Sequence, residues 1–74
     1  EPSVDDAREL LVRANACGEH YDYVTIYDRR AAWQWRAAEL SVEHGWLDPG
    51  QLVELDEQSS ELRYRVTDAG RALR

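Results

Sequence analysis

The stretch that decides the fold runs over residues 44–73. In order it reads HGWLDPG (44–50), QLVELDE (51–57), QSS (58–60) and ELRYRVTDAGRAL (61–73). Gly45 stands where a helix would end, and the Asp-Pro-Gly at 48–50 is a turn sequence. The two runs that follow alternate apolar and polar residues, which is typical of strands. Thr67 is a helix N-cap residue. The stretch therefore predicts a helix end, a β-hairpin and the start of a further helix.

One register of the hairpin pairs like with like on its inner face and opposite charges on its outer face. It has a four-residue loop at 58–61. The predicted pairs are Glu57 with Leu62, Leu55 with Tyr64, Val53 with Val66, Glu54 with Arg65, and Asp56 with Arg63. In this register the two arginines of the second strand neutralise acids of the first strand.

An amphipathic helix is predicted over residues 3–17. Ser3 is a good N-cap, and Asp6 follows at the spacing of a capping box. Glu9 and Arg13 are spaced for an ion pair one turn apart. Gly18 is the predicted stop. The predicted buried stripe is Val4, Ala7, Leu10, Leu11, Ala14 and Cys17.

A second helix is predicted from Arg29 to about His44, with Asp28 as its cap. One apolar stripe holds Trp33, Ala37, Leu40 and Trp46, and an adjacent one holds Trp35, Ala38 and Val42. Most of the three Trp and four Tyr are expected in the core, with one or two on the surface. Residues 19–28 are rich in β-branched and aromatic residues, and a strand and an irregular turn both remain open there.

The motif Tyr64-Arg65-Val66-Thr67-Asp68-Ala69-Gly70, after a helix and a hairpin, resembles the C-terminal half of a winged helix-turn-helix domain. The resemblance implies an α+β fold of about three helices with a C-terminal two-stranded β-hairpin wing. It also implies a short helix near residues 19–28. In many members the helix after the wing is long and forms a dimer, so a helix continuing after Arg74 would provide a homodimer interface.

Composition limits the class of protein. The 74 residues suffice for one domain, and 43% of them are hydrophobic, which is enough for a packed core. The start is acidic and has no initiator Met, so we expect a fragment of a longer protein. No apolar run is long enough to span a membrane, and no signal peptide is visible. The single Cys excludes an internal disulfide. We therefore expect a cytoplasmic location.

Neither metal binding nor catalysis is expected. Cys17, His20 and His44 lack the spacing of a metal site. The chain has no nucleophile elbow and no Gly-rich phosphate loop. We therefore predict a binding domain without a cofactor.

The resemblance places the helix at 29–44 in the DNA major groove, with its first residues nearest the bases. The candidate binding residues are Arg29, Arg30, Trp33, Gln34 and Arg36 on that helix, and Arg63 and Arg65 beside the wing. Cations at the start of a helix interact unfavourably with the helix dipole. A surface that binds phosphate or an acidic partner would tolerate this cost. The wing itself is polar and acidic, which disfavours its contact with DNA.

Two functions follow from these residues. The first is a transcriptional regulator that binds duplex DNA. The second is an acidic winged-helix module that binds a basic protein partner, because 15 acids against nine arginines give a net charge of -6. Clustered arginines would favour DNA, whereas arginines that each lie beside a carboxylate would favour the protein partner.

Overall fold

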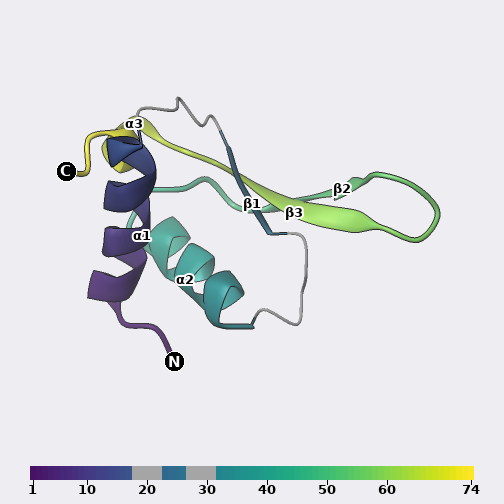
Figure 1. Ribbon diagram of the computed structural model, residues 1–74, viewed down its shortest axis with the longest axis horizontal. Helices are drawn as coiled ribbons and strands as arrows, with labels where there is room; N and C mark the ends of the chain where they lie inside the picture. Colours follow the sequence, from purple (N-terminus) through teal and green to yellow (C-terminus); the bar gives the residue numbers. More distant parts are fainter. Residues whose placement is uncertain (18–22, 27–31) are drawn as a thin grey trace.

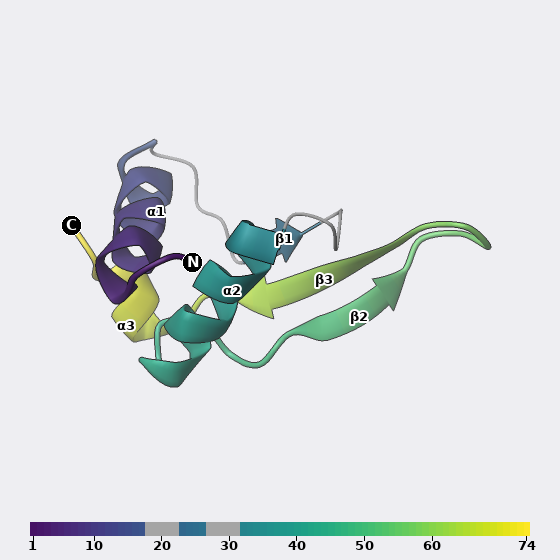
Figure 2. The ribbon, with the colours of Figure 1, turned by 90° about the horizontal axis from the view of Figure 1, so that it is seen from below.

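The computed structural model describes residues 1–17 and 32–74, and the backbone of residues 23–26. The elements are α1 (Val4–Ala16), β1 (Tyr23–Ile26), α2 (Ala32–Glu43), β2 (Gln51–Glu54), β3 (Ser60–Arg65) and α3 (Asp68–Arg71). The fold is α+β, with three helices and an antiparallel β2–β3 hairpin, as the sequence predicts. α1 and α3 lie on one side of α2, and the hairpin projects from the other side (Figures 1 and 2).

β1 settles the conformation of residues 23–26 as a strand. The sheet has the order β1-β3-β2 and both pairs are antiparallel. The short helix that the winged-helix resemblance implies near residues 19–28 therefore does not occupy these four residues. The rest of that segment, and the predicted cap Asp28 and stop Gly18, lie outside the described residues.

The predicted hairpin register is wrong. The observed pairs are Gln51 with Arg63, Leu52 with Leu62, Val53 with Glu61, and Glu54 with Ser60. The turn comes earlier than predicted because the Asp56 carboxylate accepts hydrogen bonds of 2.8 Å from the backbone N–H groups of both Gln58 and Ser59. The observed register differs from the predicted one by an odd number of residues, which exchanges the two faces of β2. Leu52, and not Val53 and Leu55, therefore lies on the same sheet face as Tyr64.

The helix ends follow local rules. Ser3 caps α1, and Asp6 completes the capping box: the Ser3 N–H donates to the Asp6 carboxylate (2.9 Å) and the Asp6 N–H to the Ser3 hydroxyl (3.1 Å). Gly45 ends α2 with a φ of 75°. The bonds from Gly45 N–H to Val42 O and from Trp46 N–H to Ser41 O form a Schellman motif.

α3 begins as predicted but ends sooner. Thr67 is its N-cap, accepting from the Gly70 N–H at 3.1 Å, and the helix stops at Arg71, before the last residue of the sequence, whereas the winged-helix resemblance implies a helix that continues after Arg74. The Asn15 side chain of α1 donates to the carbonyls of Gly70 (3.0 Å) and Leu73 (2.9 Å). These bonds satisfy carbonyls at the helix end and hold the C-terminal segment against α1.

The core is small and uses small residues on the helices. Its central cluster is Leu11, Ala38, Leu47, Tyr64 and Val66, and Ala7 and Ala37 are also buried. The predicted stripe of α1 is only partly right, because Val4, Leu10 and Cys17 are exposed. A short helix in a domain of this size has room to bury only a narrow face against α2.

Candidate interaction surface

The first half of α2 is exposed. Residues 32–36 all face solvent, with Trp33 44% and Trp35 42% exposed. The buried positions of α2 are Ala37, Ala38 and Ser41, so the helix rests on the core through small side chains. Both indoles are thus exposed although each belongs to a predicted apolar stripe, and for Trp33 this exposure agrees with its place among the candidate binding residues. Among the Trp and Tyr side chains that the structure describes, these two are exposed, and those of Tyr21, Tyr23 and Tyr27 lie outside the described residues.

Tyr64 fixes the position of α2 over the sheet. Its side chain is 1% exposed, and its hydroxyl donates to Glu39 Oε1 at 2.7 Å. The Trp35 side chain is hydrogen-bonded to the same phenol. Burial, then the hydrogen bond to the Glu39 carboxylate and its charge, raise the pKa of Tyr64 to about 12. The exposed Trp35 and Glu39 are thus held in place by a buried group of β3.

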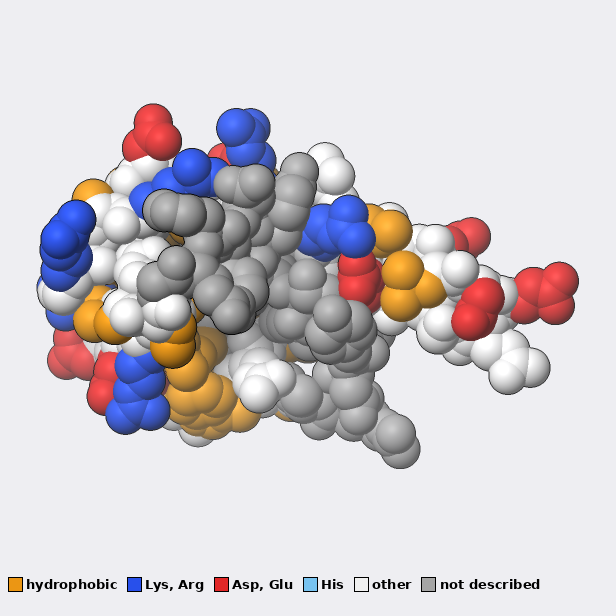
Figure 3. Space-filling model, turned by 45° about the horizontal axis from the view of Figure 1, so that its top comes forward, with side chains coloured by type: hydrophobic (Ala, Val, Ile, Leu, Met, Phe, Trp, Pro, Cys, Tyr) orange, Lys and Arg blue, Asp and Glu red, His pale blue; other side chains and the backbone are white. Residues whose placement is uncertain are grey.

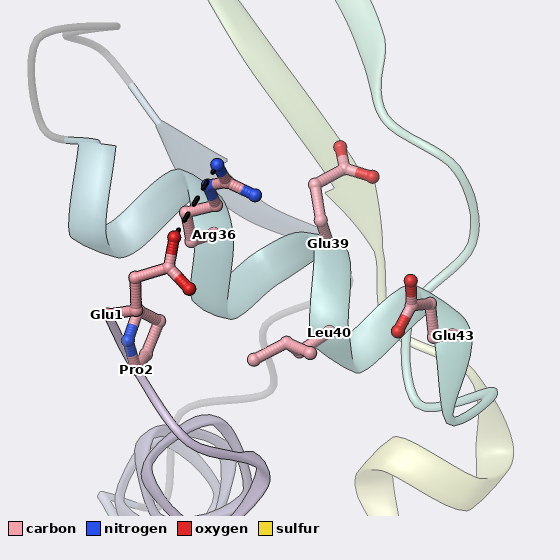
Figure 4. A pocket seen from close by; sticks show the side chains of 6 residues that line it. All are labelled: Glu1, Pro2, Arg36, Glu39, Leu40 and Glu43. Carbon is pink, nitrogen blue, oxygen red and sulfur yellow. Dashed lines mark ion pairs between the residues drawn. The ribbon is translucent and has the colours of Figure 1, made fainter.

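A small hollow lies along the same helix (Figure 4). Its volume is about 130 Å³. It is lined by Glu1, Pro2, Arg36, Glu39, Leu40 and Glu43. Arg36 faces the Glu1 carboxylate, at an N–O distance of 3.6 Å. Three carboxylates therefore share this hollow with one guanidinium group.

Only part of the predicted site is brought together. Trp33, Gln34 and Arg36 share the exposed start of α2. Arg29 and Arg30 lie outside the described residues. Arg63 and Arg65 lie on β3, where alternation puts them on the sheet face opposite Tyr64.

The predicted partners of the two strand arginines are wrong. Arg63 pairs with the buried carboxylate of Glu61, two residues away on the same face, and not with Asp56. Glu54 lies opposite Ser60 and not opposite Arg65. The cause is the shifted register, which moves Glu54 and Asp56 away from both arginines.

Arginines beside carboxylates recur elsewhere. Arg13 pairs with Glu9 at 2.8 Å, as its spacing predicts, and Arg36 faces Glu1. Arg63 and Glu61 form the third ion pair identified in the described residues. Each of these three pairs joins an arginine to an acid that lies beside it. The sequence criterion is therefore met by Arg13, Arg36 and Arg63 among the described arginines.

The sequence reasoning missed Glu39 and Glu43. Helical spacing would have found them, because they follow Arg36 by three and seven residues and so lie on its side of the helix. The sequence reasoning also assigned Glu61 to an exposed loop, whereas it is a buried strand residue. Only the correct register places it there.

No metal site is evident in the part of the chain that is described, where no three His, Cys, Asp or Glu side chains are grouped to hold an ion. Cys17 is exposed, His44 stacks on Trp46 with ring centroids 5.0 Å apart, and His20 lies outside the described residues. Among the described helices, none has both the length and the apolar composition needed to cross a membrane.

Comparisons of the chain with protein-family models, with curated proteins and with solved structures gave no match. The function is therefore inferred from the residues and their geometry.

Proposed function

We propose that this chain is a non-catalytic interaction domain of winged-helix-like fold that binds a basic protein partner through α2. The observation that carries the proposal is the exposure of Trp33 and Trp35 on a helix whose accessible side also bears Glu39 and Glu43. Exposed tryptophans supply large, rigid contact areas and are enriched at binding hot spots. Carboxylates beside them complement Lys and Arg side chains.

The charge of the whole chain supports the same partner. A net charge of -6 attracts a basic protein over long range and repels nucleic acid. The proposal includes a cytoplasmic location, since the one cysteine of the sequence cannot form an internal disulfide.

A DNA-binding regulator is the second candidate. The first turn of α2 has no acidic residue, and Gln34 and Arg36 are exposed there, which suits a helix that enters the major groove. Arg29 and Arg30 precede it in the sequence, separated from it by Ala31. Against this candidate, Glu39 and Glu43 line the same hollow as Arg36 and would approach phosphates.

An NMR titration distinguishes the two candidates. The ¹⁵N-labelled chain is titrated with a Lys- and Arg-rich peptide and, separately, with a mixed-sequence DNA duplex, at about 50 and about 200 mM salt. We expect the peptide to shift the amides of residues 32–43, and the duplex to leave them unchanged. Shifts in these amides with DNA, lost steeply as salt rises, would instead establish the second candidate.

A pair of charge-matched variants tests the site. Glu43→Gln and Asp5→Asn each remove one negative charge from an exposed side chain, the first on α2 and the second at the start of α1. We expect Glu43→Gln to weaken peptide binding several-fold more than Asp5→Asn. Equal losses would mean that the net charge, and not the α2 surface, attracts the peptide.

A further inference from the structure

β2 is an edge strand with exposed residues. In the described part of the chain it has β3 on one side and no strand on the other. The β2–β3 hairpin projects away from the helices (Figures 1 and 2). The edge of a sheet presents backbone N–H and C=O groups that another extended segment can pair with.

Two backbone bonds at the ends of the hairpin show which residues face the free edge. Leu55 N–H donates to Ser59 O at 3.0 Å, and Asp48 N–H donates to Arg65 O at 2.8 Å. The carbonyls of Ser59 and Arg65 thus both point toward β2, and Glu61 does the same because every second residue of a strand faces the same neighbour. Val53, which lies opposite Glu61, is therefore directed toward β3. Leu52 and Glu54 therefore direct their N–H and C=O groups away from β3.

The side chains along this edge have one sign of charge. Residues 51–59 include Glu54, Asp56 and Glu57, all exposed, and contain no Lys or Arg. Leu52 and Leu55 are also exposed, at 51% and 53%. Figure 3 shows this mixture of acidic and hydrophobic side chains along the projecting hairpin. The edge thus combines free backbone groups, apolar contact area and negative charge.

We infer that the free edge of β2 binds an extended, basic segment of a partner protein by strand addition. Backbone bonds at Leu52 and Glu54 hold the segment, Leu52 and Leu55 contact its apolar side chains, and the three acids contact its Lys or Arg side chains. A second copy of this chain fits poorly, because it would bring the same acids together. The inference shares with the proposed function only the charge of the partner, and it names a different surface.

The test is amide hydrogen exchange, measured by NMR with a synthetic peptide of alternating Arg and Val. At saturating peptide we expect exchange of the Leu52 and Glu54 amides to slow at least about tenfold, as for newly hydrogen-bonded groups. The amide of Val53 already faces β3 and should change little. A peptide of alternating Glu and Val is the charge control and should have no effect.

Two variants at one position separate the backbone from the charge. Glu54→Pro removes an outward N–H at an edge position that tolerates proline, and Glu54→Gln removes only the charge. We expect Glu54→Pro to abolish the slowing at Leu52, and Glu54→Gln to retain it at lower affinity. Unchanged amide shifts of Leu62 and Tyr64 show that the hairpin is intact.

The inference is overturned if the basic peptide leaves exchange at Leu52 and Glu54 unchanged, or if the acidic peptide slows it equally. Slowing that grows with protein concentration in the absence of peptide would also overturn it, because the occupant would then be a second copy. If the peptide shifts only the amides of α2, the strand-addition inference fails and the proposed function stands. If the peptide protects only the amides of β2, the strand-addition inference stands and the proposed function of α2 fails.

Discussion

Tyr64 connects the core of this protein to its proposed binding surface. Its ring is buried, and its hydroxyl joins Glu39 and Trp35, two exposed residues of α2. A Cβ added at Gly50 would come within 2.7 Å of that ring, so the chain needs glycine where it passes over the tyrosine. The orientation of the α2 surface therefore depends on a few buried atoms of β3.

The raised pKa of Tyr64 predicts a loss of stability in alkali. The folded protein retains the phenolic proton up to about pH 12, whereas the unfolded chain releases it near the ordinary value of 10.0. The contribution of this group is complete below about pH 10 and is lost as the pH rises toward 12. Denaturant unfolding of the wild type and of Tyr64→Phe across this range should show a steeper fall for the wild type. Parallel pH curves would mean that the phenol is not protected.

Gly70 predicts a steric effect. A Cβ there would lie 2.2 Å from the carbonyl oxygen of Trp46, which is backbone and cannot move freely. We expect Gly70→Ala to lower the free energy of unfolding by about 1–3 kcal/mol or more, as overpacking does. Ala69→Gly, a change of the same size at an exposed neighbour, should cost about 1 kcal/mol or less. Urea denaturation of both variants measures the difference, and equal costs would contradict the close contact.

At the level of helices and strands, the capping box of α1 gives the clearest prediction. Ser3→Ala removes the acceptor of the Asp6 N–H and should cost about 1 kcal/mol. The backbone and side-chain bonds from Ser3 hold the pKa of Asp6 below its usual value. This contribution is therefore present at neutral pH and is lost as the pH falls through the lowered pKa. Thermal unfolding of the wild type and of Asp6→Ala at pH 7 and at pH 2 should show a smaller cost of Asp6→Ala in acid, and a cost independent of pH would contradict the paired cap.

The helix ends were predictable from sequence because each is determined by a few neighbouring residues. Ser3, Gly45 and Thr67 act through bonds to residues nearby in the chain. The hairpin register was not predictable in this way. It depends on the turn formed by Asp56 and on β1, which pairs with β3 from far away in the sequence. A register chosen only by matching side chains across the two strands pairs opposite charges, but it is not the register of the structure.

The candidate surface was predictable only in part, for a related reason. Trp33 and Trp35 belong to the predicted apolar stripes of the helix, and the sequence indicates that one or two aromatic residues are exposed without showing which. The core instead takes Ala37, Ala38 and Ser41 from α2, which leaves both indoles outside. The choice between large and small residues at a helix contact depends on how closely the neighbouring elements approach, and the periodicity of the sequence does not contain that distance.

At the scale of the whole molecule, the helices and the hairpin present two separate acidic and apolar surfaces. The hollow beside α2 holds three carboxylates, and the hairpin carries three exposed acids beyond the start of β2. The described ion pairs use arginines to neutralise neighbouring acids. Together with the net charge of -6, these two surfaces support the proposed basic partner.

The most direct test of this function is calorimetric titration of the Lys- and Arg-rich peptide into the wild type, Trp33→Ala and Leu10→Ala. Trp33 on α2 and Leu10 on α1 are similarly exposed, so Leu10→Ala is a matched control for the loss of a half-exposed apolar side chain. We predict that Trp33→Ala weakens the Kd by at least about tenfold, as loss of a hot spot does, and that Leu10→Ala leaves it within about twofold. Equal affinities of Trp33→Ala and the wild type would contradict a binding surface on α2.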